Sequence, residues 1–104
     1  MSVRQEQTGL GLSNEGELAC PSCSQSNLHH SRLDWFERDE DALEGFHAII
    51  QETSVKVVTD LSDNPSNRRG GLVVTFWCEH CDSKPRLRLA QHKGSTFISM
   101  DWEP

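Results

Sequence analysis

The sequence predicts a mainly β fold: an antiparallel sheet of about five to six strands with a four-cysteine metal site at one end. Three observations lead to this prediction. Short segments rich in β-branched and aromatic residues alternate with turn sequences. All four cysteines fall in two Cys-x-x-Cys pairs. A chain of 104 residues with 35% hydrophobic residues has room for one domain and a small core, which a bound metal would reinforce.

The first 19 residues differ in composition from the rest of the chain. Residues 1–19 are polar and glycine-containing, so we expect a flexible N-terminal arm ahead of a domain that spans residues 20–104. We find no apolar run typical of a signal peptide or a membrane span. We therefore expect a cytoplasmic protein. In that compartment thiols stay reduced, and four cysteines are more typical of a metal site than of disulfides.

The first half of the domain contains one clear strand and one ambiguous segment. Residues 28–37 form the first predicted strand because aliphatic and aromatic side chains are spread along them. In residues 39–51 the apolar side chains fit one face of an amphipathic helix, and those of the last six residues also alternate as in a strand. Gly45 weakens the helix. We therefore predict a strand over residues 46–51, with the helix as the alternative.

A hairpin, a loop and a central strand are predicted next. Residues 55–61 alternate between apolar and polar side chains, and the short segment 52–54 predicts a hairpin with the preceding strand. Residues 62–71 are rich in Asn, Ser, Pro and Gly, which is typical of an exposed loop. Residues 72–77 are almost continuously β-branched or aromatic. They predict a central strand that is covered on both faces and leads into Cys78.

The last two predicted strands cover residues 86–91 and 96–102, with Gly94 marking the turn between them. Residues 86–91 begin with a strict alternation of arginine and leucine. Successive side chains of a strand point to opposite faces, so the two arginines share one face and the two leucines share the other.

The four cysteines match the tetrahedral sulfur cage that zinc prefers. A Cys-x-x-Cys loop lets two sulfurs face a single ion, and the second pair closes the cage from beyond the segment 24–77. The same ligands also suit iron. A catalytic dithiol, or a mixed cage that includes His29 or His30, is a further alternative. The predicted ligands of one structural Zn²⁺ ion are Cys20, Cys23, Cys78 and Cys81.

The segments Cys20-Pro21-Ser22-Cys23 and Cys78-Glu79-His80-Cys81 resemble the two knuckles of a zinc ribbon. The wider chain is similar to small uncharacterised zinc-ribbon proteins of bacteria and phages. This resemblance implies a zinc-ribbon-like four-cysteine knuckle site within the β fold, and it implies no particular activity. Zinc-ribbon knuckles often carry glycine just after the second cysteine, where a left-handed backbone is needed. This chain has Ser24 and Asp82 at those positions.

We expect no enzymatic activity. A catalytic zinc site combines three protein ligands with one open position, and four cysteines leave no position open. The sequence contains no phosphate-binding loop, dinucleotide fingerprint or nucleophile elbow. The acidic residues between positions 34 and 44 lack the spacing of an EF-hand and are typical of a solvated loop.

The net charge of −6 is unevenly distributed along the chain. Residues 1–63 hold 12 acidic and 4 basic residues, whereas residues 64–104 hold 6 basic and 4 acidic ones. A basic strip beside an aromatic side chain is typical of single-stranded nucleic-acid binding. Alternating arginine and leucine is also the ordinary solvent face of a strand, and an acidic chain repels phosphate at long range. The candidate nucleic-acid-binding residues are Arg68, Arg69, Lys84, Arg86, Arg88 and Lys93.

These observations together predict a small, non-enzymatic zinc-binding protein that acts as a protein-interaction or adaptor module. Its protein partner is not identified by the sequence, and neither a membrane nor a small-molecule substrate is expected. The alternative is a nucleic-acid-binding protein that uses the basic strip around Arg86 and Arg88. An exposed apolar patch that includes Trp35 or Trp102 would favour the protein partner. A steep salt dependence of binding would favour nucleic acid.

Overall fold

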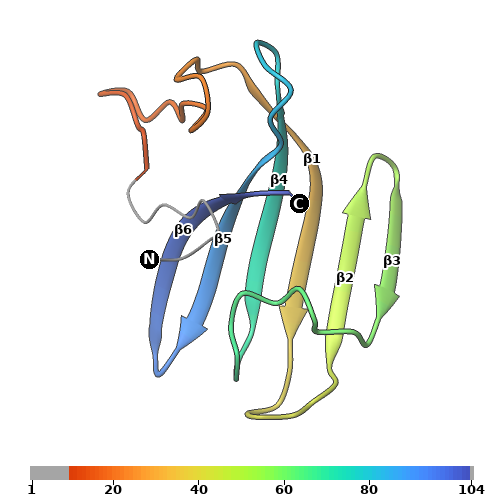
Figure 1. The fold of residues 1–104 in the computed structure, drawn as a ribbon. Helices are drawn as coiled ribbons and strands as arrows, with labels where there is room; N and C mark the ends of the chain where they lie inside the picture. The colour runs from red at the N-terminus through yellow and green to blue at the C-terminus, as the bar shows by residue number, and fades with distance from the viewer. Residues whose placement is uncertain (1–9, 104) are drawn as a thin grey trace.

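A computed structural model of the chain describes residues 10–103, which form a single six-stranded antiparallel sheet (Figure 1). This described part contains no helix, and the fold class predicted from the sequence is confirmed. The order of strands across the sheet is β3-β2-β1-β4-β5-β6. In chain order the strands are β1 (Leu28–Glu37), β2 (Phe46–Gln51), β3 (Ser54–Val58), β4 (Gly71–Cys78), β5 (Pro85–His92) and β6 (Ser95–Trp102).

The ambiguous segment forms strand β2, so the helix alternative is wrong. The close packing around residue 45 explains why it is a glycine: a Cβ atom at this position would collide with the backbone carbonyl of Glu37. The predicted hairpin is confirmed, and its turn includes Glu52 with a positive φ of 54°. Strand β3 ends at Val58, before the predicted end at residue 61. The Asp60 carboxylate accepts hydrogen bonds from the backbone amide and hydroxyl of the residue two positions later, which starts a turn instead.

The loop 59–70 carries the chain from β3, at one edge of the sheet, to β4 in its centre (Figure 1). Its middle is buried rather than fully exposed as predicted, because Ser66 is only 5% exposed. The Ser66 hydroxyl donates to the Gln91 carbonyl and accepts from the Arg69 amide. The Arg38 guanidinium donates to the carbonyls of Ser66 and Arg69. The loop is therefore fastened to the sheet at both β1 and β5.

The pairing register assigns the residues of the sheet to two faces of opposite character. On one face, which we call the polar face, charged side chains from four strands are buried or half-buried. On the other face, which we call the apolar face, two rows of side chains run across all six strands. The polar face is defined by Arg32, Asp34, His47, Thr75, Arg86, Arg88 and Asp101. The first row of the apolar face, from β3 to β6, is Val55, Ile50, Leu33, Val74, Leu87 and Met100. The second row, in the same order, is Val57, Ala48, Trp35, Leu72, Leu89 and Ile98.

The residues that precede the first cysteine form a small turn. Leu12 pairs with Leu18 across this turn, in which Gly16 has a φ of 84°. The hydroxyl of Ser13 accepts hydrogen bonds from two backbone amides of the turn. This segment and the first knuckle lie against Met100, which is 1% exposed. The flexibility of the arm and the domain limits stay predictions, and residues 1–9 and 104 lie outside the described residues.

Candidate metal centre

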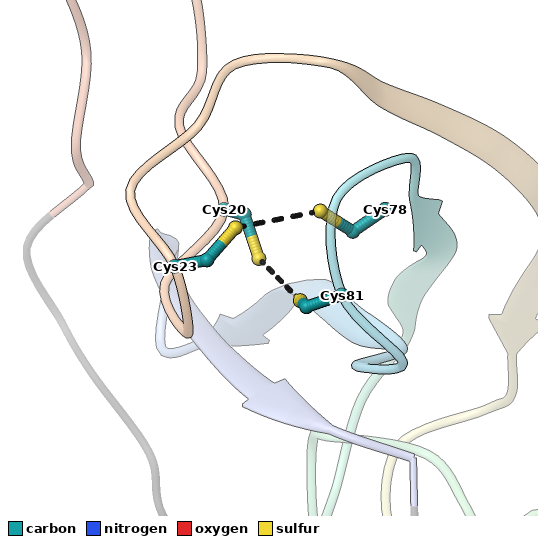
Figure 2. A group of neighbouring side chains, drawn as sticks. All are labelled: Cys20, Cys23, Cys78 and Cys81. Atoms are coloured by element: carbon teal, nitrogen blue, oxygen red, sulfur yellow. Dashed lines mark hydrogen bonds between the residues drawn. The ribbon is translucent and has the colours of Figure 1, made fainter.

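The sheet register brings the two cysteine pairs together. Cys20 and Cys23 lie in the loop that precedes β1, and Cys78 is the last residue of β4. Strands β1 and β4 are antiparallel neighbours in which Leu28 pairs with Cys78, so the start of one lies beside the end of the other. The second knuckle leads directly into β5. Figure 2 shows the two loops facing each other with their sulfur atoms turned inward.

The sulfur atoms have the spacing of a tetrahedral metal cage. The Sγ atoms of Cys23 and Cys78 are 3.6 Å apart, and those of Cys20 and Cys81 are 3.9 Å apart (Figure 2). All four Sγ atoms lie within 4.8 Å of one another. Four sulfurs placed ~2.3 Å from one tetrahedral zinc ion would be ~3.8 Å from each other. These sulfur–sulfur distances therefore fit a zinc-sized ion, and the four cysteines are free thiols rather than disulfides.

The two knuckles direct backbone amides at their first sulfur in the same way. The amide of Ser22 donates to the Sγ of Cys20, and the amide of His80 donates to the Sγ of Cys78, each over 3.4 Å. Such amides favour the thiolate over the neutral thiol, and the thiolate is the form that binds metal. The donor set and its surroundings therefore suit a divalent ion such as zinc.

The thiols do not ionise equally. The hydrogen bond from the His80 amide lowers the pKa of Cys78 to about 7. The Ser83 amide lowers the pKa of Cys81, but burial and the neighbouring thiols outweigh it and raise that pKa to about 12. The Cys78 thiol therefore loses its proton readily, whereas repulsion between neighbouring thiolates opposes the ionisation of Cys81. A bound cation offsets this repulsion, so metal binding and proton release are coupled at this site.

Only the first knuckle uses a left-handed residue after its second cysteine. Ser24 has a φ of 68°, and its amide donates to the Cys20 carbonyl over 2.8 Å. Asp82 is not among the described non-glycine residues with positive φ. The left-handed position thus falls on the serine, which pays a steric cost there that glycine would avoid.

A hydrogen-bonded chain of side chains joins the knuckles to the last strand. The indole Nε1 of Trp102 donates to the hydroxyl of Ser22, which donates to the hydroxyl of Ser83 over 2.9 Å. These contacts were not predictable from the sequence because they join residues 61 and 80 positions apart. No local pattern in the sequence signals such long-range pairs.

The histidines near the knuckles lie outside the sulfur cluster. The ring of His29 stacks on Trp77 with centroids 4.3 Å apart and pairs with the Glu79 carboxylate. The ring of His80 pairs with the Asn27 side chain at 2.7 Å. Among residues 10–103, the group with metal-site geometry consists of the four cysteines alone. The mixed cage with His29 or His30 is therefore not formed.

The structure does not gather the six basic candidates into one strip. Lys84 precedes β5 and Lys93 follows it, so these two exposed residues lie at opposite ends of the strand. Arg68 pairs with Asp41, and Arg69 pairs with Glu40 at 3.1 Å. These two arginines belong to the loop 59–70, away from the knuckle end of β5.

Arg86 and Arg88 do share one face of β5, but this is the polar face and not an open surface. Arg86 is 9% exposed and makes two hydrogen bonds to the Asp101 carboxylate, of 2.8 and 2.7 Å. It also reaches Asp63 at 3.1 Å. Arg88 lies 3.7 Å from the same Asp101 carboxylate. The expectation of a solvent-facing Arg86 is thus corrected: two aspartates provide the charge partners that a buried guanidinium requires.

Comparison of the chain with protein families, with curated proteins and with solved structures finds no match. Within residues 10–103 there is no helix long and apolar enough to cross a membrane. The features of the molecule that bear on its function are therefore the sulfur cluster and the two faces of the sheet.

Proposed function

We propose that this chain is a small zinc-ribbon-like protein in which one zinc ion is structural and the sheet acts as a protein-interaction module. The observation that carries the metal assignment is the cluster of four Sγ atoms within 4.8 Å of one another. When bound, zinc would supply four metal–sulfur bonds that join the loop before β1 to the end of β4. A closed four-thiolate site leaves no position for a substrate, which supports a non-enzymatic role.

The apolar face supports the interaction role. Trp35, which sequence analysis named as part of a possible patch, is 46% exposed there. The basic candidates give weaker support to nucleic-acid binding because Arg68, Arg69 and Arg86 already pair with carboxylates. We place the protein in the cytoplasm, where reducing conditions preserve free thiols for the metal.

The metal assignment is tested by elemental analysis and thermal melting of the wild type and Cys78→Ser. We expect one zinc ion per wild-type chain, and loss of both the zinc and the cooperative melting transition in the variant. The reason is that metal binding by a structural site contributes directly to folding. His29→Ala is the matched control because this side chain lies next to the knuckles but outside the cage, so it should keep its zinc. A Cys78→Ser protein with unchanged zinc content and melting temperature would contradict the assignment.

The interaction role is tested by capture of partners from cell lysate on zinc-loaded protein, with and without nuclease. We expect protein partners that survive nuclease and are lost when Trp35 is changed to lysine. Material that instead disappears on nuclease treatment would replace this proposal with the nucleic-acid alternative. In that case the variants to examine next are Lys84→Glu and Lys93→Glu, since both side chains are exposed, whereas Arg86→Glu would disrupt a buried ion pair.

A further inference from the structure

The apolar face is a broad hydrophobic surface that much of the described chain leaves open. Val55, Val57 and Trp35 expose 66%, 58% and 46% of their surface, and Ile50 and Ile98 expose 39% and 38%. Five further members of the two rows are half-buried. Within residues 10–103, the buried members of the rows are Ala48 and Met100, and Met100 lies beside the segment around the first knuckle.

The sheet thereby lacks the second layer that stable β domains normally have. Domains bury each hydrophobic sheet face against another layer, because one layer alone leaves that face in water. Here the loop 59–70 packs on the sheet through Ser66, and the charges of the polar face pair with one another. The side chains of Phe36 and Val73 are buried on the polar face among these charges, at 0% and 1% exposed, whereas much of the apolar face is open. Residues 10–103 therefore supply no second layer over the apolar face.

The size of the open surface is sufficient for a pair of copies. Taken together, the five exposed and five half-buried side chains of the apolar face leave on the order of 600 Å² open per copy, the size of the largest apolar patches on monomeric proteins. Two such faces in contact would remove on the order of 1,200 Å² from water in total, which is the lower end of the range for stable specific interfaces. A slender peptide would cover only part of a surface that extends across six strands.

Charge and shape also favour a second copy. A chain with a net charge of −6 pairs with itself only through a surface free of like charges. The two rows of the apolar face contain no charged residue. Glu37 borders them, and its carboxylate accepts a hydrogen bond from the Trp35 indole over 3.0 Å, which fixes this large side chain. One hollow beside it is lined by Leu72 and Leu89. A second hollow, at the far end of β1 and β2, has Leu33, Ile50 and Val74 at its base and the charged Arg32 and Glu52 in its lining.

We propose that two copies of this chain pack their apolar faces together around a two-fold axis and form a β sandwich with one sheet from each copy. This inference rests on the proposed interaction role and names the partner as a second copy. In a two-fold pair the same surface is used by both partners, so the projecting Trp35 of each copy meets the hollows of the other. The two sheets would lie ~10 Å apart, as in other sheet-on-sheet packings.

The proposal is tested by measuring the mass of the zinc-loaded protein in solution by sedimentation equilibrium over a range of concentrations. We expect the wild type to have twice the 11.8 kDa mass of one chain at micromolar concentration. We expect Trp35→Lys and Ile98→Lys to reduce it to the mass of one chain, because each places a charge in an apolar interface. Trp35 belongs to the central strand β1, so its substitution does not act on pairing between sheet edges.

The matched control is Phe97→Lys. Phe97 is 58% exposed and precedes Ile98 in β6, so it points to the opposite face. This variant should keep the dimer mass. A wild type with the mass of one chain, a dimer that persists in both test variants, or a dimer that is equally lost in the control would each overturn the proposal. Zinc content is measured in the same samples, so a monomeric protein that holds one zinc ion contradicts the dimer without touching the metal assignment.

Discussion

At the scale of single residues, the backbone of the first knuckle is strained at one position. Ser24 adopts a φ of 68°, a left-handed conformation that costs a non-glycine residue roughly 1 kcal/mol. The amide of Ser24 closes the loop onto the Cys20 carbonyl, so the conformation is tied to the position of a metal ligand.

We therefore expect Ser24→Gly to stabilise the zinc-loaded protein by about 0.5–1 kcal/mol, which raises the melting temperature by a few degrees. The measurement is thermal unfolding followed by circular dichroism. Asp82→Gly is the matched control from the second knuckle, where the backbone is not left-handed. It should not raise the melting temperature. Equal gains in both variants would show that the strain at Ser24 is not the cause.

A second residue-scale feature is the buried carboxylate on the polar face. Asp34 is 2% exposed and accepts hydrogen bonds from the Arg32 guanidinium, at 2.9 and 3.0 Å, and from the His47 ring at 2.6 Å. Burial raises the pKa of Asp34, but the hydrogen bonds from Arg32 and His47 outweigh it and hold the pKa below its usual value. The ionised form is therefore favoured by folding.

We expect Asp34→Asn to reduce the free energy of unfolding by roughly 3 kcal/mol at pH 7. Because the folded pKa lies below the unfolded value of about 3.9, this contribution is complete above pH ~4 and is lost as the pH falls through the folded pKa. The measurement is urea unfolding of the wild type and Asp34→Asn from pH 7 to pH 3. The difference between their free energies of unfolding should become smaller below pH 4. Asp41→Asn changes an exposed pair with Arg68 and should change the free energy of unfolding far less than Asp34→Asn does. If the difference in free energy of unfolding does not depend on pH, the charge of Asp34 does not have this role.

At the scale of secondary-structure elements, strands with strong local patterns were predictable. The β-branched and aromatic run of β4 (Gly71–Cys78) and the alternation of β5 (Pro85–His92) gave both elements nearly their observed bounds. The turn between β5 and β6 was predictable from Gly94, which has a φ of 81°. These features depend on neighbouring residues only, so the sequence displays them directly.

The helix-or-strand choice at β2 (Phe46–Gln51) was harder because six residues match both periods. Pairing decides it: Phe46, Ala48 and Ile50 meet Glu37, Trp35 and Leu33 of β1 and extend the apolar face by one strand. The anchoring of the loop 59–70 was also not predictable. Its contacts through Ser66 depend on the position of β5, which no pattern within the loop reveals.

At the scale of the whole molecule, the four-cysteine cluster brings together segments that are far apart in sequence, residues 20–23 and 78–81. Bringing together the two ends of the segment 24–77 lowers the entropy of the chain. The free energy of binding a metal ion to all four cysteines would offset this cost. The site lies where β1 and β4 meet, the pair at the centre of the sheet. A metal ion bound there would therefore stabilise the pairing on which the other four strands depend.

The sequence by itself determined most of the strands, the antiparallel fold class and the four candidate metal ligands. All of these follow from local periodicity and from the fixed chemistry of the Cys-x-x-Cys loop. The tertiary structure alone decided which side chains share a surface. It turned Arg86 inward to Asp101 and left Trp35 on an open apolar face. The physical reason is that burial and pairing are set by cross-strand neighbours, whose identity depends on strand order and register rather than on adjacent residues.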